Sequence, residues 1–232
     1  MSPFEAQKQS RPSAEPKFRY QRKARTIPDR GLLITFEGID GSGKSTQARL
    51  LAEHLESCGL PVRLLREPTQ GVFGRKIRAL ASAGREQLNP EQELRLFVND
   101  RLQDVLRNIR PALRQRRVVV LDRYYLSTVC YQGELGLDAE RIRRANESFA
   151  PRPDLILMLD LPVPEALRRI VELRQDRLNL FEHAEYLERV RARFLALPDP
   201  NIAVLDASRP AAQLAAAIRE RVGPLIDAHM VC

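Results

Sequence analysis

The chain has 232 residues, of which 44% are hydrophobic, and carries a formal net charge of +8. It is long enough to bury a sizeable core, and its three scattered cysteines, Cys58, Cys130 and Cys232, argue against a disulfide framework or a zinc site. No stretch approaches the roughly 18 apolar residues that a membrane span needs, and the start lacks the apolar core of a secretion signal. We therefore expect a cytoplasmic protein without a membrane partner.

The first 30 residues hold most of the positive charge. They contain eight Lys or Arg against three acids, a net +5, which leaves +3 for the remaining 202 residues. Because this segment is rich in Pro, Ser, Gln and basic residues without apolar periodicity, we predict that residues 1–30 form a disordered basic extension. Nucleic-acid binding and organelle targeting are the alternatives. Its acids, Glu5, Glu15 and Asp29, count against a transit peptide, and a nucleic-acid partner is not expected.

From residue 31 to residue 232, short apolar runs alternate with longer amphipathic segments. The apolar runs predict strands over 32–38, 61–67, 117–123, 154–162 and 201–206. Helices are predicted over 45–57, 91–115, 138–148, 164–173, 183–197 and 210–228. Nearly continuous Val, Ile and Leu is typical of strands buried on both faces of a parallel sheet. The alternation predicts one α/β domain over 31–232, with a doubly wound, parallel five-stranded sheet flanked by helices.

The first predicted turn, GIDGSGKS at 38–45, matches the phosphate-binding pattern G-x-x-x-x-G-K-S of the P-loop NTPases. It lies directly after a strand and opens directly into a helix. Glycines permit backbone conformations that let successive N–H groups point at phosphate oxygens. The loop predicts an ATP site formed by Gly38, Gly41, Ser42, Gly43, Lys44, Ser45 and Thr46. A merely flexible glycine turn is the alternative interpretation.

Within this loop, Lys44 is predicted to reach the β and γ phosphates, and the Ser45 hydroxyl is predicted to ligate Mg²⁺. Asp122, at the end of the third predicted strand, is placed to hold the same ion directly or through water. A strand-end aspartate also caps turns or pairs with arginine, so Asp122 alone would indicate little. A nucleoside triphosphate site leaves open a motor, a switch, an ATPase or a kinase.

Three further stretches bear on that choice: REPTQG at 66–71, LFVNDR at 96–101 and DRYYLSTVCYQG at 122–133. With these motifs in this order, the sequence resembles the thymidylate kinases, which move the γ phosphate of ATP to dTMP. The pattern D-R-Y-x-x-S-T-x-x-Y-Q-G is the most specific of them. The resemblance runs from about Leu32 to about Val222. It implies a P-loop fold with a short lid.

The resemblance also implies roles for individual residues. Arg123 holds the acceptor phosphate, for which a guanidinium fork is well suited, and Asp40 lies near the acceptor and the transferring phosphate. The remaining residues implied to bind the acceptor are Glu67, Pro68, Phe97, Arg101, Ser127, Thr128, Tyr131 and Gln132. In the family the matching Phe stacks on thymine, the matching Arg contacts the base, and the Gln and Tyr lie near the base and the sugar.

The residues of the predicted 91–115 helix give independent support. Leu94, Phe97, Arg101 and Val105 are spaced by three and four, so they share one face, and Arg101 interrupts an otherwise apolar stripe. A guanidinium on a buried face needs a partner or a ligand. For Phe97 alone, ordinary core packing is the alternative. The sequence departs from the commonest bacterial pattern at Thr69 and Gln70, where glycines are frequent.

The stretch RRIVELRQDRLNLFE at 168–182 resembles the family's lid, which we place at about 173–182. Phosphoryl transfer needs cations aimed at the moving group. Family members with a glycine after the loop acid, as in Asp40–Gly41, tend to take a catalytic arginine from the lid, and here the resemblance points to Arg174 and Arg177. Arg168 and Arg169 are expected on a solvated helix face. LRQDR replaces the family's usual R-G pair.

The implied function is phosphorylation of dTMP to dTDP for dTTP synthesis, with ATP as donor, Mg²⁺ as cofactor and a homodimer as the assembly. A kinase for dUMP or UMP is an alternative, because the methyl group of thymine adds only about 1 to 3 kcal/mol of discrimination. A nucleotide-binding regulatory protein without turnover is another, and the basic extension is its only support.

Overall fold

The computed structural model describes residues 30–83, 89–174 and 180–230. The predicted extension, apart from Arg30, and residues 175–179 of the predicted lid lie outside these ranges. The centre of the fold is a parallel sheet with strand order β2-β3-β1-β4-β5. Its strands are β1 (Leu33–Glu37), β2 (Val62–Arg66), β3 (Val118–Asp122), β4 (Leu155–Asp160) and β5 (Ile202–Asp206). The predicted α/β class and all five predicted strands are confirmed.

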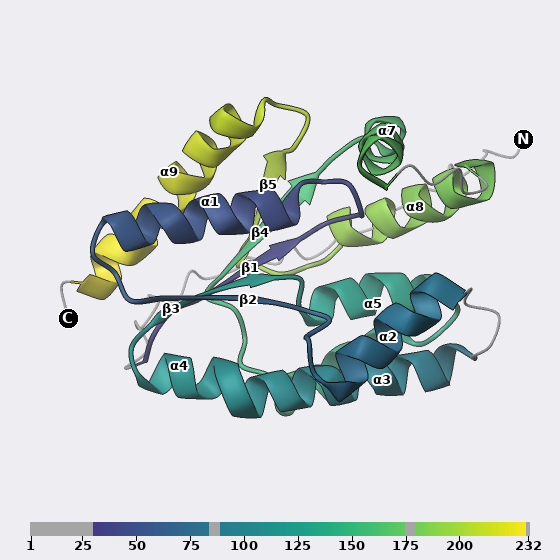
Figure 1. Ribbon diagram of the computed structural model, residues 1–232, viewed down its shortest axis with the longest axis horizontal. Helices are drawn as coiled ribbons and strands as arrows, with labels where there is room; N and C mark the ends of the chain where they lie inside the picture. Colours follow the sequence, from purple (N-terminus) through teal and green to yellow (C-terminus); the bar gives the residue numbers. More distant parts are fainter. Residues whose placement is uncertain (1–29, 84–88, 175–179, 231–232) are drawn as a thin grey trace, which may run out of the picture.

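Helices cover both faces of the sheet (Figure 1). They are α1 (Lys44–Ser57), α2 (Val72–Ala83), α3 (Pro90–Asp104), α4 (Arg110–Arg114), α5 (Tyr125–Glu134), α6 (Ala139–Glu147), α7 (Val163–Arg174), α8 (Leu180–Leu195) and α9 (Ala211–Met230). Figure 1 shows α1 and α9 above the sheet, and α3, α4 and α5 below it. Within the described ranges, no helix combines the length and apolar character needed to cross a bilayer.

Two helices, α2 and α5, are absent from the elements that the sequence predicted. The α2 helix contains a glycine, at position 74, which is required for packing. A Cβ there would lie 1.9 Å from the carbonyl oxygen of Thr69, so glycine lets the helix pack closely on the preceding segment. The α5 segment is buried on nearly all sides, which removes the amphipathic period by which a helix is found in a sequence.

The single helix predicted over 91–115 is divided in the structure. After α3 the chain forms a π-helical segment, Val105–Ile109, and then continues as α4. Pro111 accounts for the change, because it has no N–H group and its ring conflicts with the carbonyl group of Arg107, four residues earlier. The segment therefore widens by one residue before the proline.

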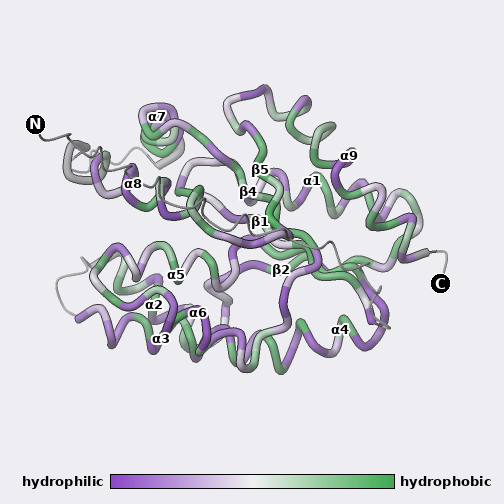
Figure 2. Tube along the Cα trace, turned by 180° about the vertical axis from the view of Figure 1, so that it is seen from behind, coloured by the Kyte–Doolittle hydropathy of each residue, from purple (hydrophilic) through white to green (hydrophobic). Residues whose placement is uncertain are grey.

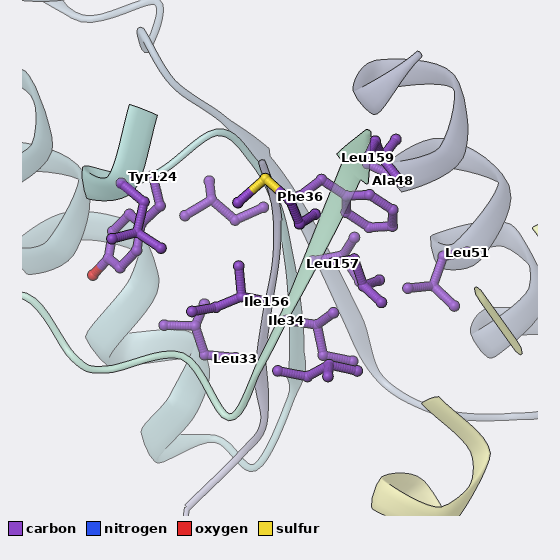
Figure 3. Packing of buried hydrophobic residues seen from close by; sticks show 14 of the residues in the cluster. Leu33, Ile34, Phe36, Ala48, Leu51, Tyr124, Ile156, Leu157 and Leu159 are labelled. Atoms are coloured by element: carbon purple, nitrogen blue, oxygen red, sulfur yellow. The ribbon is translucent and has the colours of Figure 1, made fainter. Parts of the chain in front are cut away.

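The core lies between the sheet and its helices. Every residue of β1 is buried, and its side chains alternate between the two faces. Figure 3 shows Ile34 and Phe36 on the side of α1, near Ala48 and Leu51, whereas Leu33 lies on the opposite side. In Figure 2 hydrophobic residues follow β1 and β4, while the helices alternate between hydrophobic and hydrophilic residues.

All five strands end on a charged residue: Glu37, Arg66, Asp122, Asp160 and Asp206. Because the strands are parallel, these residues are brought to the same edge of the sheet. In open α/β sheets the carboxyl edge is where ligands bind. The fold therefore places the predicted phosphate loop and the strand-end acids together.

Candidate active site

The phosphate loop joins β1 to α1 at this edge. Gly41 has φ of 80° and Gly43 has φ of 89°, both in the left-handed region. A Cβ at Gly41 would lie 2.5 Å from the carbonyl oxygen of Ala166, whereas a Cβ at Gly43 would meet nothing within 4 Å. Gly43 precedes the first residue of α1, whose N-terminus has no side-chain cap. The uncapped N–H groups and the open space beside Gly43 suit a phosphate.

Lys44 lies over its own loop. Its Nζ donates hydrogen bonds to the carbonyl oxygen of Ile39, at 2.6 Å, and to Oγ of Ser42, at 3.3 Å. Burial, assisted by the nearby Arg123, lowers the pKa of Lys44 to about 7. An anionic ligand in the loop would favour the charged form of this amine, so the site gains attraction for phosphate as phosphate arrives.

Ser45 and Asp122, the two residues predicted to hold a metal ion, contact each other. The Ser45 hydroxyl donates a hydrogen bond to Oδ2 of Asp122, whose other oxygen, Oδ1, is buried and has no hydrogen-bond partner in the described part of the chain. An unpaired buried carboxylate oxygen beside a hydroxyl fits a hard cation. No group of three or more His, Cys, Asp or Glu suited to a metal occurs among the described residues. Further ligands would come from phosphate and water, as is usual for Mg²⁺.

A cavity of about 450 Å³ opens over the phosphate loop. It includes residues 40–47 and extends to Ala207, Ala211 and Leu214, which offer an apolar surface. Arg169 and Arg209 also line it, although the sequence had placed Arg169 on a solvated helix face. That expectation is wrong for Arg169, because its Nη2 donates to the carbonyl oxygen of Ala207 and thereby turns toward the cavity. Arg168 is exposed as expected, paired with Glu165 and Glu172.

A second cavity, of about 250 Å³, lies between the loop, β2, α3 and α5. Every residue that the sequence predicted for the acceptor site lines it: Asp40, Glu67, Pro68, Phe97, Arg101, Arg123, Ser127, Thr128, Tyr131 and Gln132. Sequence reasoning missed the other lining residues, Arg66, Ile77, Arg78, Ala81 and Tyr124. Three of these belong to α2, so the failure to predict that helix also removed the signal for them.

Arg123 stands at the entrance to α5 in a left-handed conformation, with φ of 69°. Its Nη2 donates to Oδ1 of Asp40 and its Nη1 to Oγ of Ser127, at 3.2 Å. The guanidinium carbon lies 5.5 Å from the centre of the Tyr131 ring, over its face. Burial disfavours the charged form of Arg123, but Asp40 and other nearby groups raise its pKa overall. Arg123 therefore keeps its positive charge although its side chain is largely buried.

Arg101 is almost fully buried and has several partners. Its Nε and Nη2 donate to Oε2 of Glu67, at 2.9 and 2.6 Å, its Nη1 donates to Asn146 Oδ1, and its Nη2 also reaches Thr128 Oγ1. These bonds use four of the five N–H groups of a guanidinium and leave one on Nη1. Burial raises the pKa of Glu67, and Arg101 opposes this rise. Asn146 is a partner that the sequence did not indicate.

The segment after β2 is fixed on both sides. Thr69 donates from its N–H and its hydroxyl to the two oxygens of Asp100, at 2.7 and 2.6 Å. Arg78 donates to the carbonyl oxygens of Pro68 and Thr69. The Glu67–Pro68 peptide bond is cis. Thr69, a departure from the family pattern, is thus an anchor of this segment.

The two cavities adjoin. Asp40, Arg66 and Arg123 line both of them, and they lie at the ends of β2 and β3 and in the phosphate loop. Arg66 also approaches Asp122, with 3.5 Å between Nε and Oδ2. Groups bound in the two cavities would meet at these three residues. Such a shared wall is what direct transfer between two bound molecules requires.

The predicted lid arginines cannot be placed beside this wall. Arg177 and the side chain of Arg174 lie outside the described residues, although Arg174 is the last residue of α7. Their predicted catalytic role stays a prediction.

Comparison with known proteins agrees with the geometry. The family model described as "Thymidylate kinase" matches residues 36–218. A probable thymidylate kinase of Archaeoglobus fulgidus is 43% identical over 199 residues, which cover 86% of this chain and 96% of the relative. A thymidylate kinase of Desulfotalea psychrophila is 48% identical, covering 76% and 87% of the two chains, and one of Xanthomonas campestris is 49% identical, covering 78% of each.

Proposed function

Because this chain belongs to the thymidylate kinase family, we propose that it transfers the γ phosphate of ATP to dTMP and so forms dTDP. The observation that carries this proposal is the pair of adjoining cavities that share Asp40, Arg66 and Arg123. One cavity contains the phosphate loop and the other contains the residues expected around an acceptor. The reaction is then a matter of holding two phosphates in line.

On the donor side, the N–H groups at the start of α1 and the amine of Lys44 bind the phosphate chain of ATP. Ser45 and Asp122 would hold Mg²⁺, since Asp122 Oδ1 has no hydrogen-bond partner among the described residues. When bound, the ion would neutralise charge on the donor phosphates. Ala207, Ala211 and Leu214 give the nucleoside an apolar surface.

On the acceptor side, Arg123 binds the phosphate of dTMP through its guanidinium fork. Asp40 and Ser127 hold that guanidinium from two directions. Arg66, at the same wall, adds a second positive charge where charge gathers during transfer. No protein nucleophile takes part, because an oxygen of the acceptor phosphate attacks the γ phosphorus itself.

The base preference follows from two unused polar groups in the acceptor cavity. Gln132 Oε1 is buried and has no hydrogen-bond partner in the described ranges, and Arg101 retains one N–H on Nη1. The Gln132 oxygen can accept from N3–H of thymine or uracil, and the Arg101 N–H can donate to O4. Cytosine presents the opposite pattern, an acceptor at N3 and a donor at the 4-amino group. Phe97 lines the same cavity and offers a ring for stacking. We therefore expect dTMP and dUMP to be bound more tightly than dCMP.

The test is ADP formation with ATP, Mg²⁺ and, in turn, dTMP, dUMP, UMP and dCMP. We expect dTMP to be the best acceptor, and Lys44→Ala to lower kcat by about 100-fold or more. Lys76→Ala is the matched control, since Lys76 is exposed on α2 and lines neither described cavity. Preference for another monophosphate would overturn the proposed acceptor. Turnover that survives in Lys44→Ala would overturn the role of the loop.

We also propose that the protein acts as a cytoplasmic homodimer, which the family resemblance implies. Leu102 and Leu106 support a protein contact, because they lie four residues apart and are 36% and 54% exposed. Sedimentation of the wild type and of Leu106→Glu tests the assembly. A wild-type monomer at micromolar concentration would contradict it.

A further inference from the structure

Glu37 is a buried carboxylate between the two halves of the candidate active site. It ends β1, directly before the phosphate loop, and is fully buried. Its Oε1 accepts a hydrogen bond from the N–H of Tyr124, at 3.1 Å, and its Oε2 accepts one from the Ser127 hydroxyl. Both donors belong to the segment that follows Arg123. Burial raises the pKa of Glu37 to about 7, which shows that a carboxylate is unfavourable here unless its partners compensate.

The first of these bonds fixes the backbone at Arg123. A left-handed conformation is unfavourable for a residue with a Cβ and persists only where the surroundings impose it. Here the last two residues of β1 do so. The carbonyl oxygen of Phe36 accepts the N–H of Arg123 itself, at 3.0 Å, and Glu37 accepts the next N–H along the chain.

The second bond fixes the guanidinium. Ser127 Oγ accepts a hydrogen bond from Nη1 of Arg123 and donates one to Oε2 of Glu37. The hydroxyl is therefore oriented from both sides: its hydrogen points at Glu37, and its lone pairs are left to accept from Arg123. Asp40 holds the opposite nitrogen, Nη2. Arg123 thus has a direct carboxylate partner on one side and an indirect one on the other.

We propose that Glu37 is a positioning residue for the acceptor phosphate, because it sets both the backbone turn and the guanidinium of Arg123. This inference rests on the proposed function. Within the described part of the chain, Glu37 lines neither cavity, so it acts through Arg123 and Ser127 and not by touching a substrate. What matters at this position is the length of the side chain, which must allow it to bond Tyr124 N–H and Ser127 Oγ at the same time.

Two substitutions of Glu37 separate the effect of its side-chain length from the effect of its charge. Glu37→Asp keeps the charge but is one methylene shorter, so it loses at least one of the two bonds. Glu37→Gln keeps the length and shape, accepts from Tyr124 N–H through its oxygen, and donates from its amide to one lone pair of Ser127 Oγ, whose second lone pair still accepts from Arg123. If position is what matters, Gln preserves the arrangement better than Asp.

The experiment measures kcat and both KM values for the wild type and the two variants, with thermal unfolding as a check on folding. For Glu37→Asp we expect kcat/KM for dTMP to fall about 10- to 100-fold, in line with the loss from a displacement of roughly 1 Å. The KM for ATP should stay within about twofold, because the loop is not held by these bonds. Glu37→Gln should retain kcat/KM for dTMP within about fivefold of the wild type.

An impaired Gln variant beside an active Asp variant would show that charge is required and would overturn the inference. Equal rises in KM for both substrates, together with lower thermal stability, would indicate a purely structural role and also overturn it. Two variants that match the wild type would do the same. A wild type that does not turn over dTMP would defeat the proposed function instead, so the two failures are distinct.

Discussion

At the scale of single residues, the acceptor side is distinguished by buried carboxylates. Glu37, Glu67 and Asp104 are at most 3% exposed, and burial raises the pKa of each. Glu37 and Glu67 each hold residues of the candidate site. Asp104 is different, because it accepts a single hydrogen bond, from Asn108, whereas Glu37 and Glu67 each accept two. Its Oδ2, like Oε1 of Glu67, has no hydrogen-bond partner among the described residues. Of the three carboxylates, Asp104 is therefore the one that accepts the fewest hydrogen bonds.

Substitution of Asp104 tests whether its buried carboxylate destabilises the folded protein. Burial, together with neighbours such as Asp100, raises its pKa from 3.8 to about 6. Between these two values the folded protein holds a proton that the unfolded chain has released, so the free energy of unfolding falls as pH rises through this window. Asp104→Asn removes that loss, and above pH 6 we expect the variant to be more stable than the wild type by about 1 to 3 kcal/mol.

Urea unfolding from pH 4 to pH 8 measures the difference between the two proteins. The increase in the free energy of unfolding of Asp104→Asn over the wild type should be small at pH 4 and complete above pH 6. Asp227→Asn, at an exposed position of α9, is the control and should not change the pH dependence. A gain that is the same at every pH would contradict the assignment.

At the scale of elements, α3 shows how a helix delivers site residues. It begins at a capping box, in which Asn89 accepts from the N–H of Gln92 while the Gln92 side chain accepts from the N–H of Asn89, with Pro90 at the first helical position. These signals lie in neighbouring residues and are readable in a sequence. The start of α3 fixes where Phe97 and Arg101 lie along its axis.

Removal of the cap should weaken α3 without altering the site. For Asn89→Ala we expect the free energy of unfolding to fall by about 1 kcal/mol, which lowers Tm by about 2 to 4 °C in a chain of this size. Asn89→Gly should lose only a few tenths of that energy, because glycine is itself tolerated at a cap. Calorimetry compares the three proteins. Equal losses in the Ala and Gly variants would show that the cap is not the cause.

What the sequence could predict differs between elements for physical reasons. Strands β1, β3 and β4 were predictable because burial on both faces demands apolar residues, and the phosphate loop was predictable because positive φ favours glycine. The edge strands β2 and β5 are exposed at several positions, and only their short apolar runs identified them. Arg101 was noticed because it interrupts an apolar stripe, but its partners Glu67 and Asn146 are 34 and 45 residues away. The role of Glu37 was missed because its two partners come from the segment after β3, and no local pattern records such a contact.

At the scale of the whole molecule, one core serves both cavities. The cluster of buried hydrophobic residues runs from Leu32 to Val222 and includes side chains from every strand. Arg30 joins this domain through Asp154, at 3.2 Å. The family match, over 36–218, lies within the same limits. Among the described residues, the core and the two cavities draw on positions from Leu32 onward.

Deletion of residues 1–29 is therefore expected to leave kcat/KM for dTMP within about twofold and Tm within about 2 °C. The basic charge of this segment is the one feature that favours nucleic-acid binding, so DNA binding by the full chain and the deletion variant should be measured over a range of salt concentrations. We expect weak binding in both. Tight, salt-sensitive binding that the deletion abolishes would revive the regulatory alternative.

Asp40, Arg66 and Arg123, the wall shared by the two cavities, limit which substitutions could make this protein resistant to an inhibitor. A compound that contacts only Phe97 or Ala207 leaves room for resistance, because each of these residues belongs to one cavity. A compound anchored on the shared wall contacts residues that line both cavities, which under the proposed function bind the two nucleotides. We therefore expect a substitution there that excludes the compound to weaken binding of the donor, the acceptor or both, so that resistance would come at the expense of turnover.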